Sequence, residues 1–165
     1  MRILGIDPGS QRTGFGVLDD VGGQPVYVAC GAIVALSGTV PERLDRIFSG
    51  VVEVIENYRP DVCVVERVFF ARNPDSALKL GQARGVVLVA ASRANLAVYE
   101  YTALQIKKAS VGVGHATKAQ VQHMMRALLG LSALPSPDAA DALACALCHM
   151  HHSQGKARLS GVGRS

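Results

Sequence analysis

A short, uninterrupted apolar run at residues 61–65 constrains the fold of this chain more than any other feature. After Asp61 it is apolar at four consecutive positions, which is typical of a strand buried on both faces. The preceding stretch, Pro41 to Tyr58, has apolar residues at helical spacing and is ended by Arg59-Pro60. A helix that leads into such a strand is the pattern of a parallel crossover. We therefore expect an α/β fold with a sheet flanked by helices.

Turn signals divide the rest of the chain into further elements. The first third alternates glycine-containing turns with short β-rich runs, which predicts an antiparallel meander of three strands. After the buried strand we expect a long helix, one more strand and three shorter helices. The predicted strands are 2–7, 14–18, 26–34, 61–65 and 97–101, and the predicted helices are 41–58, 75–94, 103–109, 117–129 and 137–151.

Length and composition favour one folded domain. A chain of 165 residues that is 49% apolar can bury one substantial core, and no linker divides it. We expect the domain to span residues 1–152, and the polar, basic residues 153–165 to form a disordered tail. No apolar run reaches the roughly 20 residues of a membrane helix, and the start of the chain does not resemble a signal peptide. We therefore expect a cytoplasmic protein that does not bind membranes.

Four carboxylates lie at the ends of predicted elements. Asp7 closes the first strand, Glu66 closes the buried strand, and Asp138 and Asp141 share one face at the start of an alanine-rich helix. Three of them also have simpler interpretations, namely a turn residue for Asp7, a solvated strand end for Glu66 and a complement to the helix dipole for Asp138. Asp141 lies in an almost wholly apolar helix, where a buried carboxylate requires a partner.

Carboxylates that converge can bind divalent cations, and a basic chain can bind a polyanion on which such cations act. The chain has 17 Lys and Arg residues against 13 Asp and Glu. Two Mg²⁺ ions about 4 Å apart can activate a water and neutralise charge on a scissile phosphate, and Mg²⁺ prefers carboxylate oxygen. We therefore expect a phosphodiester hydrolase whose metal ligands and catalytic residues are Asp7, Glu66, Asp138 and Asp141.

Four segments of the sequence together carry a family resemblance. They are Gly5-Ile6-Asp7-Pro8-Gly9-Ser10 with Thr13-Gly14-Phe15-Gly16, then Val65-Glu66, then Ala77-Leu78-Lys79-Leu80-Gly81-Gln82-Ala83-Arg84-Gly85, and finally Asp138-Ala139-Ala140-Asp141-Ala142-Leu143-Ala144. Over essentially residues 1 to 152 the chain closely resembles the RuvC family of bacterial Holliday junction resolvases. The resemblance implies a ribonuclease H-like fold, with a mixed five-stranded sheet flanked by helices.

The resemblance also implies an activity and partners. It implies a homodimeric, Mg²⁺-dependent crossover junction endodeoxyribonuclease of DNA recombination and repair, with Mn²⁺ as a possible substitute for Mg²⁺. Such an enzyme nicks two strands of a four-way DNA junction symmetrically and works with a branch-migration helicase complex, RuvA and RuvB. The four carboxylates match the family's acidic positions. A two-fold dimer presents two identical sites, which suits two equivalent strands of a junction.

Basic residues predict the path of the DNA. Lys107, Lys108 and Lys118, with Arg72, are the residues that we expect to contact phosphates, and the spacing of the lysines resembles a basic segment of the family. The alternative is that these lysines only solubilise helix surfaces.

Aromatic and glycine pairs predict two further contacts. By resemblance Phe69 stacks on bases at the junction centre and Phe70 supports it, although both could instead anchor a loop in the core.

Gly81 and Gly85 lie four apart in a predicted helix, where each costs about 1 kcal/mol. Close approach of another helix would explain this cost. The resemblance suggests a dimer interface there, and packing against the protein's own sheet is the alternative.

Two other classes of function compete with a nuclease. Actin-like or sugar-kinase-like ATPases also carry an Asp-x-Gly turn after a first strand, but they need two lobes around a nucleotide, for which 165 residues are too few. A non-enzymatic junction-binding scaffold would bind junctions without metal-dependent nicking, and it would leave the buried position of Asp141 unexplained.

Overall fold

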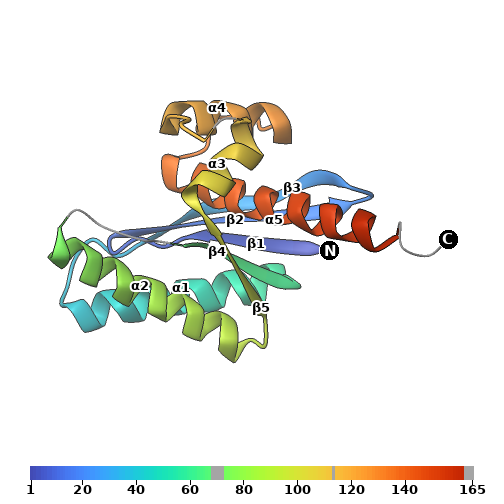
Figure 1. The fold of residues 1–165 in the computed structure, drawn as a ribbon. Helices are drawn as coiled ribbons and strands as arrows, with labels where there is room; N and C mark the ends of the chain where they lie inside the picture. Colours follow the sequence, from blue (N-terminus) through green and yellow to red (C-terminus); the bar gives the residue numbers. More distant parts are fainter. Residues whose placement is uncertain (68–72, 113, 162–165) are drawn as a thin grey trace.

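A mixed five-stranded sheet forms the centre of the computed structural model, which describes residues 1–67, 73–112 and 114–161 (Figure 1). Strands β1 (Arg2–Asp7), β2 (Arg12–Val21) and β3 (Gln24–Val34) form an antiparallel meander. Strand β4 (Val62–Arg67) pairs with β1 in parallel, and β5 (Ala97–Thr102) pairs with β4 in parallel. The strand order is β3-β2-β1-β4-β5. The predicted meander and the predicted crossover into a buried parallel strand are both confirmed.

Helices cover both faces of the sheet (Figure 1). Helices α1 (Val40–Tyr58) and α2 (Pro74–Arg93) lie on one face, and α3 (Ala103–Val111), α4 (Lys118–Leu129) and α5 (Pro137–Gly161) lie on the other. Thr39, Thr102 and Thr117 begin α1, α3 and α4, each in a reciprocal capping box with the Glu or Gln three residues on. The helices therefore begin where local side-chain chemistry satisfies their first amides.

Glycines allow α5 to lie very close to the sheet. A Cβ at Gly5 of β1 would overlap the carbonyl oxygen of Ala142, and a Cβ at Gly14 of β2 would overlap that of Asp138. Gly16 faces the backbone of Leu143 in the same way. The first turns of α5 therefore rest directly on the strand backbones. This close packing fixes where the acidic residues of α5 lie relative to β1.

Helix α5 continues past the predicted end of the domain. It runs to Gly161, whereas the sequence predicts a disordered tail from residue 153. Residues 162–165 lie outside the described residues. The Ser153 hydroxyl donates to the Met150 carbonyl oxygen at 2.8 Å, and Gln154 Nε2 donates to the Gly23 carbonyl oxygen at 3.2 Å. The second bond ties α5 to the β2–β3 turn. The composition of the segment does not predict this contact.

Among the helices of the described residues, none has both the length and the apolarity to cross a bilayer.

Candidate active site

Strand alternation turns Asp7 and Glu66 toward the same face of the sheet. Gly5, two residues before Asp7, faces α5, and Val64, two residues before Glu66, belongs to the core that α5 covers. Because side chains of a strand alternate between its faces, Asp7 and Glu66 also face α5. The register pairs the residues just before them across adjacent parallel strands. The two carboxylates therefore end neighbouring strands at one edge of the sheet, as the sequence predicts.

The first turn of α5 brings the other two acids to the same edge. Gly14 pairs with Asp7 across β1 and β2, and the backbone of Asp138 fills the space that a side chain at Gly14 would need. Asp141 lies one turn further along α5, where its side chain is 22% exposed. Asp7, Glu66, Asp138 and Asp141 thus meet at one end of the molecule although they come from three elements.

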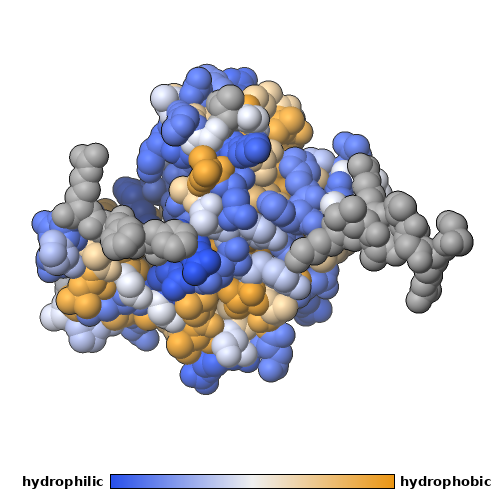
Figure 2. All heavy atoms as spheres, in the orientation of Figure 1, coloured by the Kyte–Doolittle hydropathy of each residue, from blue (hydrophilic) through white to orange (hydrophobic). Residues whose placement is uncertain are grey.

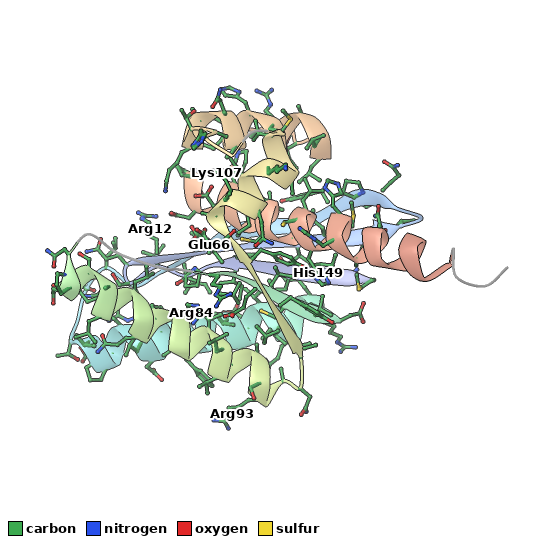
Figure 3. The ribbon with its side chains drawn as sticks, viewed as in Figure 1. Arg12, Glu66, Arg84, Arg93, Lys107 and His149 are labelled. Atoms are coloured by element: carbon green, nitrogen blue, oxygen red, sulfur yellow. The ribbon has the colours of Figure 1, made fainter. Side chains whose placement is uncertain are left out.

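Three of the acids line a hollow of about 310 Å³ between the sheet edge, α3 and α4. In Figure 3, Glu66 lies between the sheet and α3, the helix that carries Lys107. Lys118, the first residue of α4, places its Nζ 3.6 Å from Asp141 Oδ2. The side chains that line the hollow are those of Asp7, Pro8, Glu66, Leu80, Ala103, Ile106, Lys107, Lys118, Val121 and Asp141.

Burial and mutual repulsion make these carboxyls difficult to ionise together. Burial, followed by the charges of Glu66 and Asp141, raises the pKa of Asp7 to about 7. Burial is also the largest cause of the raised pKa values of Glu66 and Asp141, and the positive charge of Lys118 opposes it at both. A divalent cation would offset the repulsion and favour the ionised forms.

The chemistry of the donors fits Mg²⁺, a hard cation that takes carboxylate oxygens. As the side chains lie, no three His, Cys, Asp or Glu residues in the described part of the chain are arranged to hold an ion. Lys118 instead supplies the positive partner of Asp141. Binding of a cation would therefore require the carboxylates to rotate toward a common point.

Sequence and fold comparisons place this chain in a known family. A family model described as crossover junction endodeoxyribonuclease RuvC matches residues 3–149. The chain belongs to the RuvC family. The RuvC of Shewanella piezotolerans is 55% identical over 163 residues, which cover 99% of this chain and 94% of that protein. The RuvC of an Azoarcus species is 55% identical over 162 residues, which cover 98% of this chain and 88% of that protein.

Solved RuvC structures share the fold over nearly the whole chain. Thermus thermophilus RuvC in complex with a Holliday junction substrate superposes with a TM-score of 0.87 at 38% identity, covering 94% of this chain and 96% of that one. The yeast mitochondrial Holliday junction resolvase Ydc2 has a TM-score of 0.66 at 13% identity, covering 90% of this chain and 78% of that one, and shows likeness of fold alone. The predicted ribonuclease H-like fold is confirmed.

The structure separates the basic residues that the RuvC resemblance grouped together. Lys107 and Lys118 line the hollow. Lys108 is exposed and is not part of the lining. The predicted contacts of Phe69, Phe70 and Arg72 fall outside the described residues. Lys107 and Lys118 are therefore the predicted phosphate contacts that the fold places beside the acids.

The glycines of the RuvC-like segment in α2 lie against open space. Apart from the adjoining residues and backbone of α2 itself, no atom of the described residues lies within 4 Å of the position that a Cβ would take at Gly81 or Gly85. The alternative that these glycines allow α2 to pack against the protein's own sheet is therefore wrong.

Raising the pH from about 4 to about 7 should lower the free energy of unfolding when divalent cations are absent. The pKa of Asp7 rises from the ordinary 3.8 to about 7 on folding, so the folded state holds a proton that the unfolded chain releases. Stability is therefore lost across this interval, and Glu66 and Asp141 contribute in the same direction. Urea unfolding in EDTA at several pH values measures the slope. Asp7→Asn should make the slope shallower, and an unchanged slope would contradict the burial of this carboxyl.

Proposed function

We propose that this chain is a structure-selective endonuclease that resolves four-way DNA junctions by paired, symmetric nicks. The observation that carries the proposal is that acids from β1, β4 and α5 meet in one hollow, beside Lys107 and Lys118. Membership of a family of crossover junction endodeoxyribonucleases supports the substrate class. A scaffold that only bound junctions would have no use for carboxyls that are costly to bury beside a polyanion.

The four acids would hold divalent cations, which activate the attacking water and stabilise charge on the scissile phosphate. We propose two Mg²⁺ ions per site, replaceable by Mn²⁺, because every donor is a hard oxygen. Asp7 lies between Glu66 on β4 and the acids of α5, so it is the natural shared ligand. Asp141 lines the hollow and Asp138 does not, which favours Asp141 as a direct ligand and a role for Asp138 in orienting water. Lys107 and Lys118 would contact phosphates.

We also propose that the chain acts as a homodimer through the face formed by α1 and α2. Hydrophobic residues gather along α2 in Figure 2, and the side chains of Leu78 and Val89 are 63% and 52% exposed. A hollow of about 420 Å³ next to them is lined by Leu44, Asp45, Phe48, Gln82, Gly85, Val86 and Val89. The open space at Gly81 and Gly85 would let a partner's backbone approach closely. Two identical sites then suit two equivalent strands.

Val89→Glu should weaken the dimer by about 100-fold or more, because the new carboxylate would lose its hydration in the interface. Sedimentation equilibrium over a range of protein concentrations measures the dissociation constant. Val21→Glu is the matched control, since Val21 is 59% exposed at the end of β2, away from α2. A Val89→Glu protein that dimerises as tightly as the control would rule out this face.

Family membership alone supports two further proposals. We propose that the enzyme acts in the cytoplasm and cooperates there with a branch-migration helicase complex of RuvA and RuvB. Co-purification of the three proteins on an immobilised junction, compared with an immobilised linear duplex, tests the cooperation. Recovery of this chain that does not depend on the helicase proteins would count against it.

The nuclease proposal is tested with a synthetic four-way junction labelled in turn on each strand. With Mg²⁺ we expect nicks at symmetric positions in two strands of equal polarity, and no cutting in EDTA. A linear duplex of the same sequence should be cut at least about 100-fold more slowly. Tight junction binding without nicks in Mg²⁺ or Mn²⁺ would support the scaffold instead, and equal cutting of the duplex would refute structure selectivity.

A further inference from the structure

Arg12 begins β2 on the face of the sheet that carries the acidic site. Two residues further on, Gly14 faces Asp138 of α5, and side chains two apart in a strand share a face. Gly14 pairs with Asp7 on the neighbouring strand. The Cα atoms of Arg12 and Asp7 are therefore roughly 8 Å apart by strand geometry. Figure 3 shows the side chain of Arg12 on the α5 side of the sheet, where Lys107 also lies.

Arg12 and Lys107 approach the acids from opposite sides. In the strand order β2-β1-β4-β5, Arg12 belongs to β2, and the acidic strand ends belong to β1 and β4. Lys107 lies on α3, which directly follows β5. Across this edge the positive side chain of Arg12 is followed by the acidic Asp7 and Glu66, and these are followed by the positive side chain of Lys107. A negatively charged strand that crossed the carboxylates would thus meet a cation on each side.

The loop that joins Asp7 to Arg12 is firmly held. The hydroxyl of buried Thr13 donates to the Gly9 carbonyl oxygen at 3.0 Å, and the Ala35 amide donates to the Gln11 carbonyl oxygen at 2.8 Å. From the other face of the sheet, Arg43 of α1 donates to the Ser10 carbonyl oxygen. The backbone of Arg12 is therefore fixed relative to Asp7. A side chain on such a base can position a phosphate at little cost in backbone entropy.

The guanidinium of Arg12 is available to a ligand. Arg2 pairs with Asp19, and Arg84 pairs with Glu100. By contrast, Arg12 is exposed, and no carboxylate of the described residues lies within ion-pair distance of it. An arginine fork without an acidic partner matches phosphate oxygens in geometry and in charge.

We propose that Arg12 binds a phosphate of the strand to be cut, one or two nucleotides from the scissile phosphate and on the side opposite Lys107. This inference rests on the proposed nuclease function and extends it. Held at two points, the strand cannot slide across the carboxylates, so Arg12 contributes to the rate of cutting as well as to affinity. The residue would act on any sequence, because it reads the backbone and not the bases.

Arg12→Gln should weaken junction binding about 10-fold and lower the slope of log K against log [salt] by roughly 0.7 to 0.9, the loss of one phosphate contact. Binding is measured in EDTA, and single-turnover nicking in Mg²⁺ at saturating protein should fall by at least about 10-fold. Arg12→Lys should restore the salt slope but only part of the nicking rate. Arg46→Gln removes the same charge from the opposite face of the sheet, at a residue of α1 that does not line the hollow of the proposed dimer face, and should change none of these values.

Neutral methylphosphonates, placed one at a time around the cut site, locate the contact without altering the protein. At one position the methylphosphonate should weaken junction binding by the wild-type protein and have little further effect on binding by the Arg12→Gln protein. Fully additive losses at every position, or an Arg12→Gln protein with wild-type slope and rate, would overturn the inference. Absence of nicking by the wild-type protein would instead overturn the nuclease proposal, while the salt slope and the methylphosphonate positions in EDTA would still decide whether Arg12 binds phosphate.

Discussion

Asp7→Asn should abolish nicking of a four-way junction in Mg²⁺ while junction binding survives. Asp7 lies between Glu66 and the acids of α5, so its loss would remove the shared ligand of the cation site. Loss of about 4 kcal/mol of transition-state stabilisation corresponds to a rate about 10³-fold lower. Single-turnover nicking of a labelled junction measures the rate, and gel retardation in EDTA measures binding.

A second observation separates this loss from misfolding. Because burial raises the pKa of Asp7 to about 7, an uncharged amide should make the protein at least as stable as wild type at pH 8 in EDTA. Glu53→Gln, on the exposed face of α1, also neutralises an acid and should leave nicking unchanged. Near-normal nicking by Asp7→Asn would show that the metal-site assignment is wrong.

Gly14→Ala should have the second largest effect, although it alters no charged group. The new Cβ would overlap the carbonyl oxygen of Asp138, so the first turn of α5 would have to move away from β2. Overpacking of this kind costs about 1–3 kcal/mol of stability. The same movement displaces Asp138 and Asp141 from Asp7, and we expect nicking to fall by about 100-fold at temperatures where the variant is folded.

Thermal unfolding and single-turnover nicking of Gly14→Ala are measured together with a matched control. Gly155→Ala changes the same residue type near the other end of α5, where a Cβ would meet no atom of the described residues within 4 Å. Replacing a glycine within a helix by alanine there should be neutral or stabilising by up to about 1 kcal/mol. Wild-type stability and nicking in Gly14→Ala would show that the close approach of α5 does not matter.

The sequence predicts the order of the elements well because its signals are local. The apolar run of β4, the helical spacing of apolar residues in α1 and the glycine turns of the meander each act within a few residues. The four acids could be proposed for the same reason, since each lies at the end of an element. Strand pairing then supplies what the sequence lacks, namely that Asp7 and Glu66 share a face and an edge.

Features that depend on contacts distant in the sequence could not be predicted. The extension of α5 is anchored by Gln154 on Gly23, 131 residues away. Lys107 and Lys108 are adjacent and chemically equal, and only the orientation of α3 decides which of them lines the hollow. Arg12 looks like an ordinary turn residue until the register of β2 places it beside Asp7.

Diffraction from crystals soaked in Mn²⁺, recorded at the manganese absorption edge, would show whether the carboxylates bind metal ions together. We expect two anomalous peaks about 4 Å apart at the sheet edge, with Asp7 within coordination distance of both. We also expect Glu66 and Asp141 on either side of Asp7, and loss of both peaks in Asp7→Asn. Manganese bound only at other sites, with none near Asp7, would contradict this expectation.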